Sequence, residues 1–182
     1  MRSFSYFILL LFFYSCKTAG NDALPPEVSD VSLLKSGYSK TQIRINDLRK
    51  KYLTDFRKAG NDVMKNNIKE EYQKKLHHYL LDSCLKVIDC GNVYVKNIKN
   101  EISNNANLLS AEFTDQSCLY TFSNSFPNDE DLNNFPEYKF LTELKKGANT
   151  SIKFLYSGDC MVSNPLDSAL QTFIIKAVPY IE

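Results

Sequence analysis

Two adjacent histidines, His77 and His78, are the only histidines in the chain and the first candidates for metal or acid–base chemistry. Neighbouring residues on a helix point about 100° apart, so the two rings do not face one metal ion together. The sequence has no His-x-x-x-His pair and no third ligand in register. We therefore predict no metal site and no zinc hydrolase. We expect these histidines to interact with the negative end of a helix dipole.

Five cysteines offer thiol chemistry, and Cys16 stands apart from the others because it follows an apolar N-terminal run. The remaining four are candidate disulfide cysteines: Cys84, Cys90, Cys118 and Cys160. An even number suits two disulfides in an oxidising compartment, and four cysteines allow three pairings that the sequence does not choose between. Buried free thiols are the alternative. No Cys-x-x-Cys motif occurs, which argues against a thiol oxidoreductase or a compact zinc site.

Other catalytic classes lack their motifs. There is no Gly-x-Ser-x-Gly elbow for a serine hydrolase, and no arginine from Asp82 onward to support phosphoryl chemistry. The acidic run 129–131 lacks calcium-loop spacing, and we expect it to cap a helix. We predict no catalytic residue and no cofactor. A small secreted enzyme, with a site assembled from scattered residues, is the alternative left open.

The first 15 residues predict export. Arg2 precedes the apolar run 4–13, which is typical of a signal peptide. The segment Phe13-Tyr14-Ser15-Cys16 is similar to a lipobox, in which the cysteine receives diacylglycerol, with palmitate as a usual acyl chain, and becomes the new N-terminus. Cleavage before Asn21 is the alternative. A permanent anchor needs about 20 apolar residues, and it is the weaker alternative because Ser15, Cys16 and Lys17 break this run.

Charge is distributed unevenly, although the whole chain is nearly neutral. Residues 40–75 hold eleven Lys and Arg against five Asp and Glu, a balance of +6. Residues 82–182 hold eight against thirteen, a balance of −5. The basic segment could meet anionic phosphates, contact the acidic body, or form a solvated helix face.

A tether over 16–37 and a helical segment over 38–82 are expected next. Ser39 and Gln42 give a capping-box spacing. Gly60 interrupts the helical pattern, so either one kinked helix or a hairpin of two helices fits, and we favour a break there. Apolar residues follow helical steps through this segment: Ile45, Leu48, Tyr52, Phe56, Val63, Ile68, Tyr72, Leu76 and Tyr79. This stripe predicts packing on the following domain or self-association.

Alternating apolar residues predict five strands in the remaining segment, 83–182, at 85–98, 108–114, 119–126, 150–157 and 172–181. A short helix within 129–146, ended by Gly147, falls between the third and fourth strands. A change of apolar parity around Gly91 indicates a bulge in the first strand. The fold class is therefore α+β.

The order of three strands, a helix and two strands resembles an OB-fold, a five-stranded Greek-key barrel. Residues 138–158, with Leu-Lys-Lys-Gly at 144–147, are similar to OB-fold lipoproteins related to tRNA-anticodon-type domains. The resemblance implies a ligand face across the second and third strands. A small Greek-key sandwich or a lipocalin-like fragment is the alternative.

OB-fold proteins that bind nucleic acid stack bases on exposed aromatic residues in a basic groove. Four aromatic residues lie on the relevant strands here, and their alternation predicts a core position: Phe113, Tyr120, Phe122 and Phe126. The surrounding barrel is acidic, so we predict no nucleic-acid partner.

Together these features predict a membrane-anchored envelope lipoprotein that faces the periplasm or the cell exterior. We expect a non-catalytic binding or adaptor module with a protein or glycan partner. A structural protein that self-associates through the helical segment is the alternative. In a eukaryotic source, the sequon at 149–151 would instead indicate a secreted glycoprotein.

Overall fold

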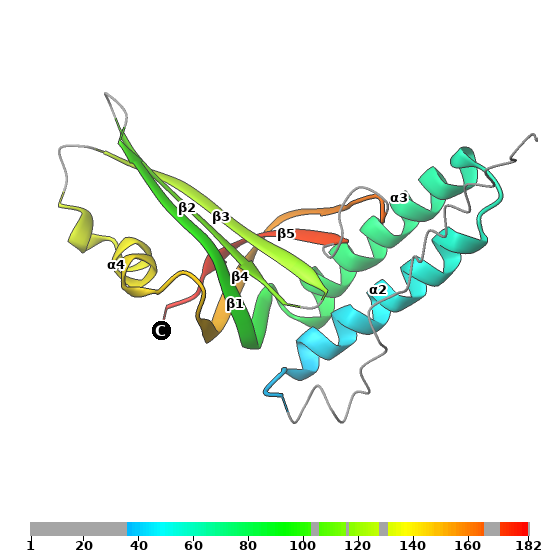
Figure 1. Ribbon diagram of the computed structural model, residues 1–182, viewed down its shortest axis with the longest axis horizontal. Coiled ribbons are helices and arrows are strands. Elements are labelled where there is room, and N and C mark those ends of the chain that lie inside the picture. The colour runs from blue at the N-terminus through cyan, green and yellow to red at the C-terminus, as the bar shows by residue number, and fades with distance from the viewer. Residues whose placement is uncertain (1–35, 103–105, 116, 128–130, 166–171, 182) are drawn as a thin grey trace, which may run out of the picture.

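A computed structural model describes residues 36–102, 106–115, 117–127, 131–165 and 172–181. Two antiparallel helices, α2 (Lys40–Lys58) and α3 (Asp62–His78), lead through a π-helical turn at Tyr79–Ser83 into a β-barrel. Figure 1 shows the two helices side by side at one end of the molecule and α4 (Pro136–Glu143) at the other, with the strands between them. The predicted α+β class is confirmed.

The helical segment is a hairpin of two helices rather than one kinked helix. Ser39 and Gln42 form the predicted capping box, each side chain bonding the backbone of the other. The break falls at Gly60, and the side chain of Asn61 caps the second helix by accepting a bond from the Met64 N–H. Local sequence signals therefore set both helix starts.

Five strands close into a barrel in the order β1-β2-β3-β5-β4. Their bounds are β1 Val87–Ile102, β2 Ala106–Thr114, β3 Cys118–Pro127, β4 Asn149–Val162 and β5 Phe173–Pro179. All neighbouring pairs are antiparallel except β3 and β5, which are parallel. The predicted five-stranded OB-like barrel, with one helix between the third and fourth strands, is confirmed.

The predicted bulge in β1 is also confirmed, because the register against β4 shifts between Cys90 and Val93. A Cβ atom on Gly91 would lie 2.1 Å from the Gly37 carbonyl oxygen. No L side chain fits there without a backbone shift, so the bulge needs glycine where α2 joins the barrel.

Several element bounds differ from the expectation. β1 begins two residues later than predicted and continues to Ile102, because its polar end pairs with β2. The short helix occupies only Pro136–Glu143 of the predicted interval. Asp131 caps a separate 3₁₀ turn, η2 (Leu132–Asn134), by accepting a bond from the Asn133 N–H, so it is not the cap of α4. The other two acidic residues of that run lie outside the described residues.

One core joins the hairpin to the barrel. The helical stripe packs onto barrel residues such as Phe173, whose ring centroid lies 6.1 Å from that of Tyr52. Fully or almost fully buried stripe residues are Ile45, Tyr52, Phe56, Tyr72 and Leu76. The sequence predicted that this stripe packs on the following domain or self-associates. These five residues pack on the barrel. Among the described residues the buried core draws on 45–177, so a chain that begins at residue 36 retains each of these core residues.

Candidate functional site

The two histidines have different partners. His77 Nδ1 lies 2.8 Å from the Tyr156 hydroxyl on β4, and His78 Nδ1 lies 3.4 Å from an Asp82 carboxylate oxygen. Both rings fall in the last turn of α3, where the dipole argument placed them. Within the described residues, no group of three His, Cys, Asp or Glu side chains is arranged to hold a metal ion.

No disulfide joins the four cysteines of the described residues in this structure. Cys90 and Cys118 lie in the barrel interior and are fully buried, and Cys160 Sγ lies 3.9 Å from the Gln73 carbonyl oxygen of α3. Burial raises the pKa of the Cys90 and Cys118 thiols well above the ordinary value, so they are poor nucleophiles. Disulfide pairing stays a prediction. Cys16, the predicted lipidation site, lies outside the described residues.

The strand aromatics face the core as predicted. Phe113, Tyr120, Phe122 and Phe126 are buried, and the Tyr120 ring stacks on that of Phe154 at 5.1 Å with an interplanar angle of 8°. None of these four rings is exposed as a stacking platform for a base.

Asp115 is the site residue that the sequence did not reveal. It lies in the turn between β2 and β3, where one carboxylate oxygen accepts bonds from the Ser117 and Cys118 N–H groups at 2.7 and 2.8 Å. The other accepts bonds from Gln42 Nε2 and the Tyr120 hydroxyl, both at 3.0 Å. The predicted strands at 108–114 and 119–126 leave Asp115 in the connection between them, but its partner Gln42 lies 73 residues away.

Burial raises the pKa of the Asp115 carboxyl, while the four hydrogen bonds partly offset this effect. A neighbouring polar contact, from the Ser117 hydroxyl to Asn46 Oδ1 at 2.8 Å, also joins the turn to α2. Asp115 is half-buried, and both of its carboxylate oxygens bond groups of the protein, so it helps to fix the hairpin to the barrel.

A hollow of about 220 Å³ opens on the outer face of β1, β2 and β3, and we call it the outer hollow. Cross-strand pairing explains its lining, because Asn97 lies opposite Glu112, and Glu112 lies opposite Thr121. The lining residues are Asn97, Lys99, Ser110, Ala111, Glu112, Thr121 and Phe122.

The outer hollow offers hydrogen bonds rather than a reactive group. Its polar lining supplies one amide, one ammonium, one carboxylate and two hydroxyls. Glu112 is held in place by Lys96, whose Nζ lies 3.4 Å from the Glu112 carboxylate. The outer hollow lies on β1, β2 and β3. It therefore includes the second and third strands, across which the OB resemblance implies a ligand face.

Comparisons with protein-family models, with curated proteins and with solved structures find no match to this chain. None of the helices among the described residues has the length and apolar content needed to cross a membrane. Functional assignment therefore depends on the chain's own residues.

Proposed function

We propose that this chain is a non-catalytic binding module that holds a hydroxyl-rich ligand, such as a glycan, in the outer hollow. The observation that carries the proposal is the lining of that hollow, where amide, carboxylate, ammonium and hydroxyl groups converge on one face of the sheet. Such groups donate and accept hydrogen bonds in several directions, as a ligand with many hydroxyls requires. A hollow of about 220 Å³ suits a small polar group better than a folded partner.

Export and membrane attachment through lipid-modified Cys16 are part of the same proposal. The tether would hold the barrel at the membrane, facing the periplasm or the cell exterior, where envelope glycans are accessible. The likeness to OB-fold lipoproteins supports this placement, since it rests on the strand order and on the segment before β4. The absence of an exposed aromatic platform among Phe113, Tyr120, Phe122 and Phe126 supports a ligand other than nucleic acid.

A glycan array tests this proposal with the chain from residue 36 onward and two charge-matched variants. Ser110→Arg fills the outer hollow, whereas Ser125→Arg adds the same side chain on the outward face of the sheet, at an exposed residue outside it. We expect selective glycan binding by the unaltered chain. Ser110→Arg should weaken it about tenfold, or about 1.4 kcal/mol, and Ser125→Arg should leave it unchanged.

Two results would refute the proposal. Equal glycan binding by Ser110→Arg would show that the ligand lies elsewhere. Cleavage of a bound glycan during the incubation would show an enzyme instead of a binding module.

A further inference from the structure

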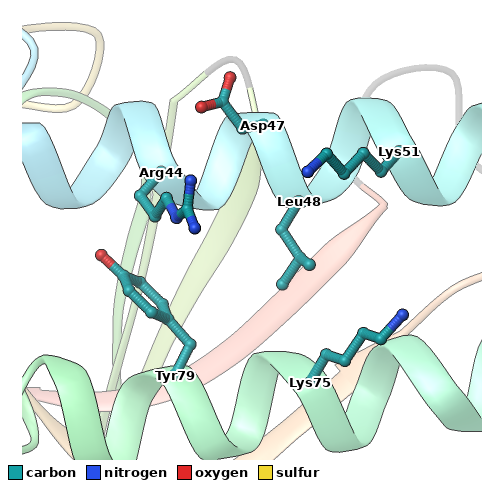
Figure 2. A pocket seen from close by; sticks show the side chains of 6 residues that line it. All are labelled: Arg44, Asp47, Leu48, Lys51, Lys75 and Tyr79. Carbon is teal, nitrogen blue, oxygen red and sulfur yellow. The ribbon is translucent and has the colours of Figure 1, made fainter.

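A second hollow, of about 150 Å³, lies between α2 and α3 on the side away from the barrel, and we call it the helix groove. Helix α2 supplies Arg44, Asp47, Leu48 and Lys51 at helical spacing, and Lys75 and Tyr79 come from the facing side of the hairpin. Figure 2 shows both helices in the foreground and the strands behind them. None of these residues takes part in the outer hollow.

The groove concentrates positive charge. Arg44, Leu48 and Tyr79 project into the space between the helices, whereas Asp47 projects away from α3 (Figure 2). Neither Arg44 nor Lys51 makes an ion pair within the part of the chain that the structure describes. Their charges are therefore available to an anion.

Lys75 and Tyr79 complete the lining from the other side. Lys75 Nζ bonds the Glu71 carboxylate and lies 4.4 Å from the centroid of the Tyr72 ring, which restrains the ammonium beside the groove. Burial raises the pKa of Tyr79, so its hydroxyl remains protonated at neutral pH. Leu48 packs against the core and forms an apolar wall.

We propose that the helix groove binds a phosphate group. A carboxylate is satisfied by one bidentate arginine, whereas a phosphate carries up to two charges and presents oxygens in several directions. Arg44 supplies a planar fork and Lys51 a point charge, both from α2 and both unpaired among the described residues. Lys75, which pairs with Glu71, lies on the other side of the groove. Two unpaired cations match the two charges of a phosphate better than the single charge of a carboxylate.

Two kinds of ligand carry a phosphate group with this chemistry. One is the headgroup of an anionic phospholipid in the membrane to which the tether is predicted to attach. The other is a phosphorylated small molecule free in solution. Both place the same group against Arg44 and Lys51, and separate binding measurements distinguish them.

The test compares two double variants that remove the same charge from the hairpin. Arg44→Gln with Lys51→Gln removes the unpaired cations of the groove. Arg57→Gln with Lys74→Gln removes one arginine and one lysine that are exposed on the same two helices but do not line it. Far-ultraviolet circular dichroism and thermal unfolding confirm that each variant is folded.

Two probes are used with the chain from residue 36 onward. Inorganic phosphate is titrated at constant ionic strength against chloride, with backbone amide shifts as the readout. Phosphatidylcholine vesicles with and without phosphatidylglycerol are tested by flotation. We expect a saturable response to at least one probe, weakened about tenfold or more in the groove variant and less than about twofold in the control.

Each outcome is decisive. Groove-dependent binding of inorganic phosphate assigns a free phosphate, and groove-dependent binding of phosphatidylglycerol vesicles alone assigns a lipid headgroup. Equal losses in both double variants, or no saturable response to either probe, would overturn the proposal. Because the outer hollow is intact in both variants, this test is independent of glycan binding.

Discussion

Two opposing effects, hydrogen bonding and burial, act on the charge of the Asp115 carboxyl. One of its four hydrogen bonds, from Gln42, joins the β2–β3 turn to α2, and the other three hold the turn to β3. Burial of the carboxyl, in contrast, disfavours its charged form. Because burial has the larger effect, the pKa of this carboxyl is raised above its ordinary value of 3.8. The folded chain therefore binds this proton more tightly than the unfolded chain does.

The first prediction concerns the pH dependence of stability. As pH rises from 3.8 through the raised pKa of Asp115, the unfolded state loses this proton first and the free energy of unfolding falls. Asp115→Asn is neutral at every pH and still offers an acceptor to the Ser117 and Cys118 N–H groups. Urea denaturation at a series of pH values should show a smaller fall for the variant. Parallel curves would contradict the assigned pKa direction.

The second prediction uses two glycines in different surroundings. Gly91→Ala places a methyl group 2.1 Å from the Gly37 carbonyl oxygen, so the contact between β1 and the start of α2 must open. We expect a loss of about 1–3 kcal/mol in the free energy of unfolding. Gly60→Ala is the control, because nothing lies within 4 Å of its Cβ position. An equally stable Gly91→Ala protein would show that the bulge tolerates a side chain.

At the scale of elements, the first turn of α2 is hydrogen-bonded to β1. The Ser39 hydroxyl donates to the Asp89 carbonyl of β1, and Gln42 Nε2 donates to the Asn92 carbonyl at 2.8 Å. Both side chains also belong to the capping box, so one pair of residues starts the helix and docks it.

The third prediction follows from the two roles of Ser39, as the cap of α2 and as a donor to β1. Ser39→Ala should lower the free energy of unfolding by about 1–2 kcal/mol, because it removes an N-cap and a bond to the barrel. Thr54→Ala is the matched control, since the Thr54 hydroxyl bonds only the Lys50 carbonyl of its own exposed turn. Denaturation of both variants by urea checks the difference. Equal losses would show that the Ser39 bonds add nothing beyond an ordinary exposed hydroxyl.

Local signals made much of the element order predictable. The capping box at Ser39, the glycine break at 60 and the parity change at Gly91 all act over a few residues, and the structure has each of them. The polar end of β1 was missed because only its pairing with β2 makes it a strand. Asp115 was missed for a related reason, since its partner Gln42 is distant in the sequence.

At the scale of the whole molecule, the hairpin and the barrel share one hydrophobic core. Ile45, Tyr52 and Leu76 are fully buried in the core they share with the barrel. The hairpin is therefore not an independent stalk. Any surface for self-association would have to lie outside these buried stripe residues.

The fourth prediction concerns removal of residues 38–81. This deletion uncovers barrel residues such as Phe173 and leaves Asp115 without Gln42, so we expect no cooperative thermal unfolding. The chain from residue 36 onward is the control and should unfold cooperatively by circular dichroism. A deleted chain with the same melting temperature as the control would refute the shared core.

The fifth prediction addresses the proposed anchor. In the full chain, Cys16→Ala removes the sulfur that would carry the lipid, so palmitate labelling should be lost and the protein should leave the membrane fraction. Cys84→Ala is the control, since a free thiol in the body should not affect labelling. If Cys16→Ala remains in the membrane fraction and the unaltered chain takes up no palmitate, the anchor is of another kind.

The contacts at the start of α2 also have a mechanical consequence. The Asn92 side chain of β1 donates to the Ser36 carbonyl at 3.0 Å, three residues before the Ser39 bond to the same strand. Tension arriving along the chain from the N-terminal side would thus be passed to β1 at residues 36–39. The load would enter the closed barrel directly instead of unwinding the hairpin. If the chain is anchored through Cys16 as proposed, a pull on the anchor would therefore reach β1 before it reaches the helices.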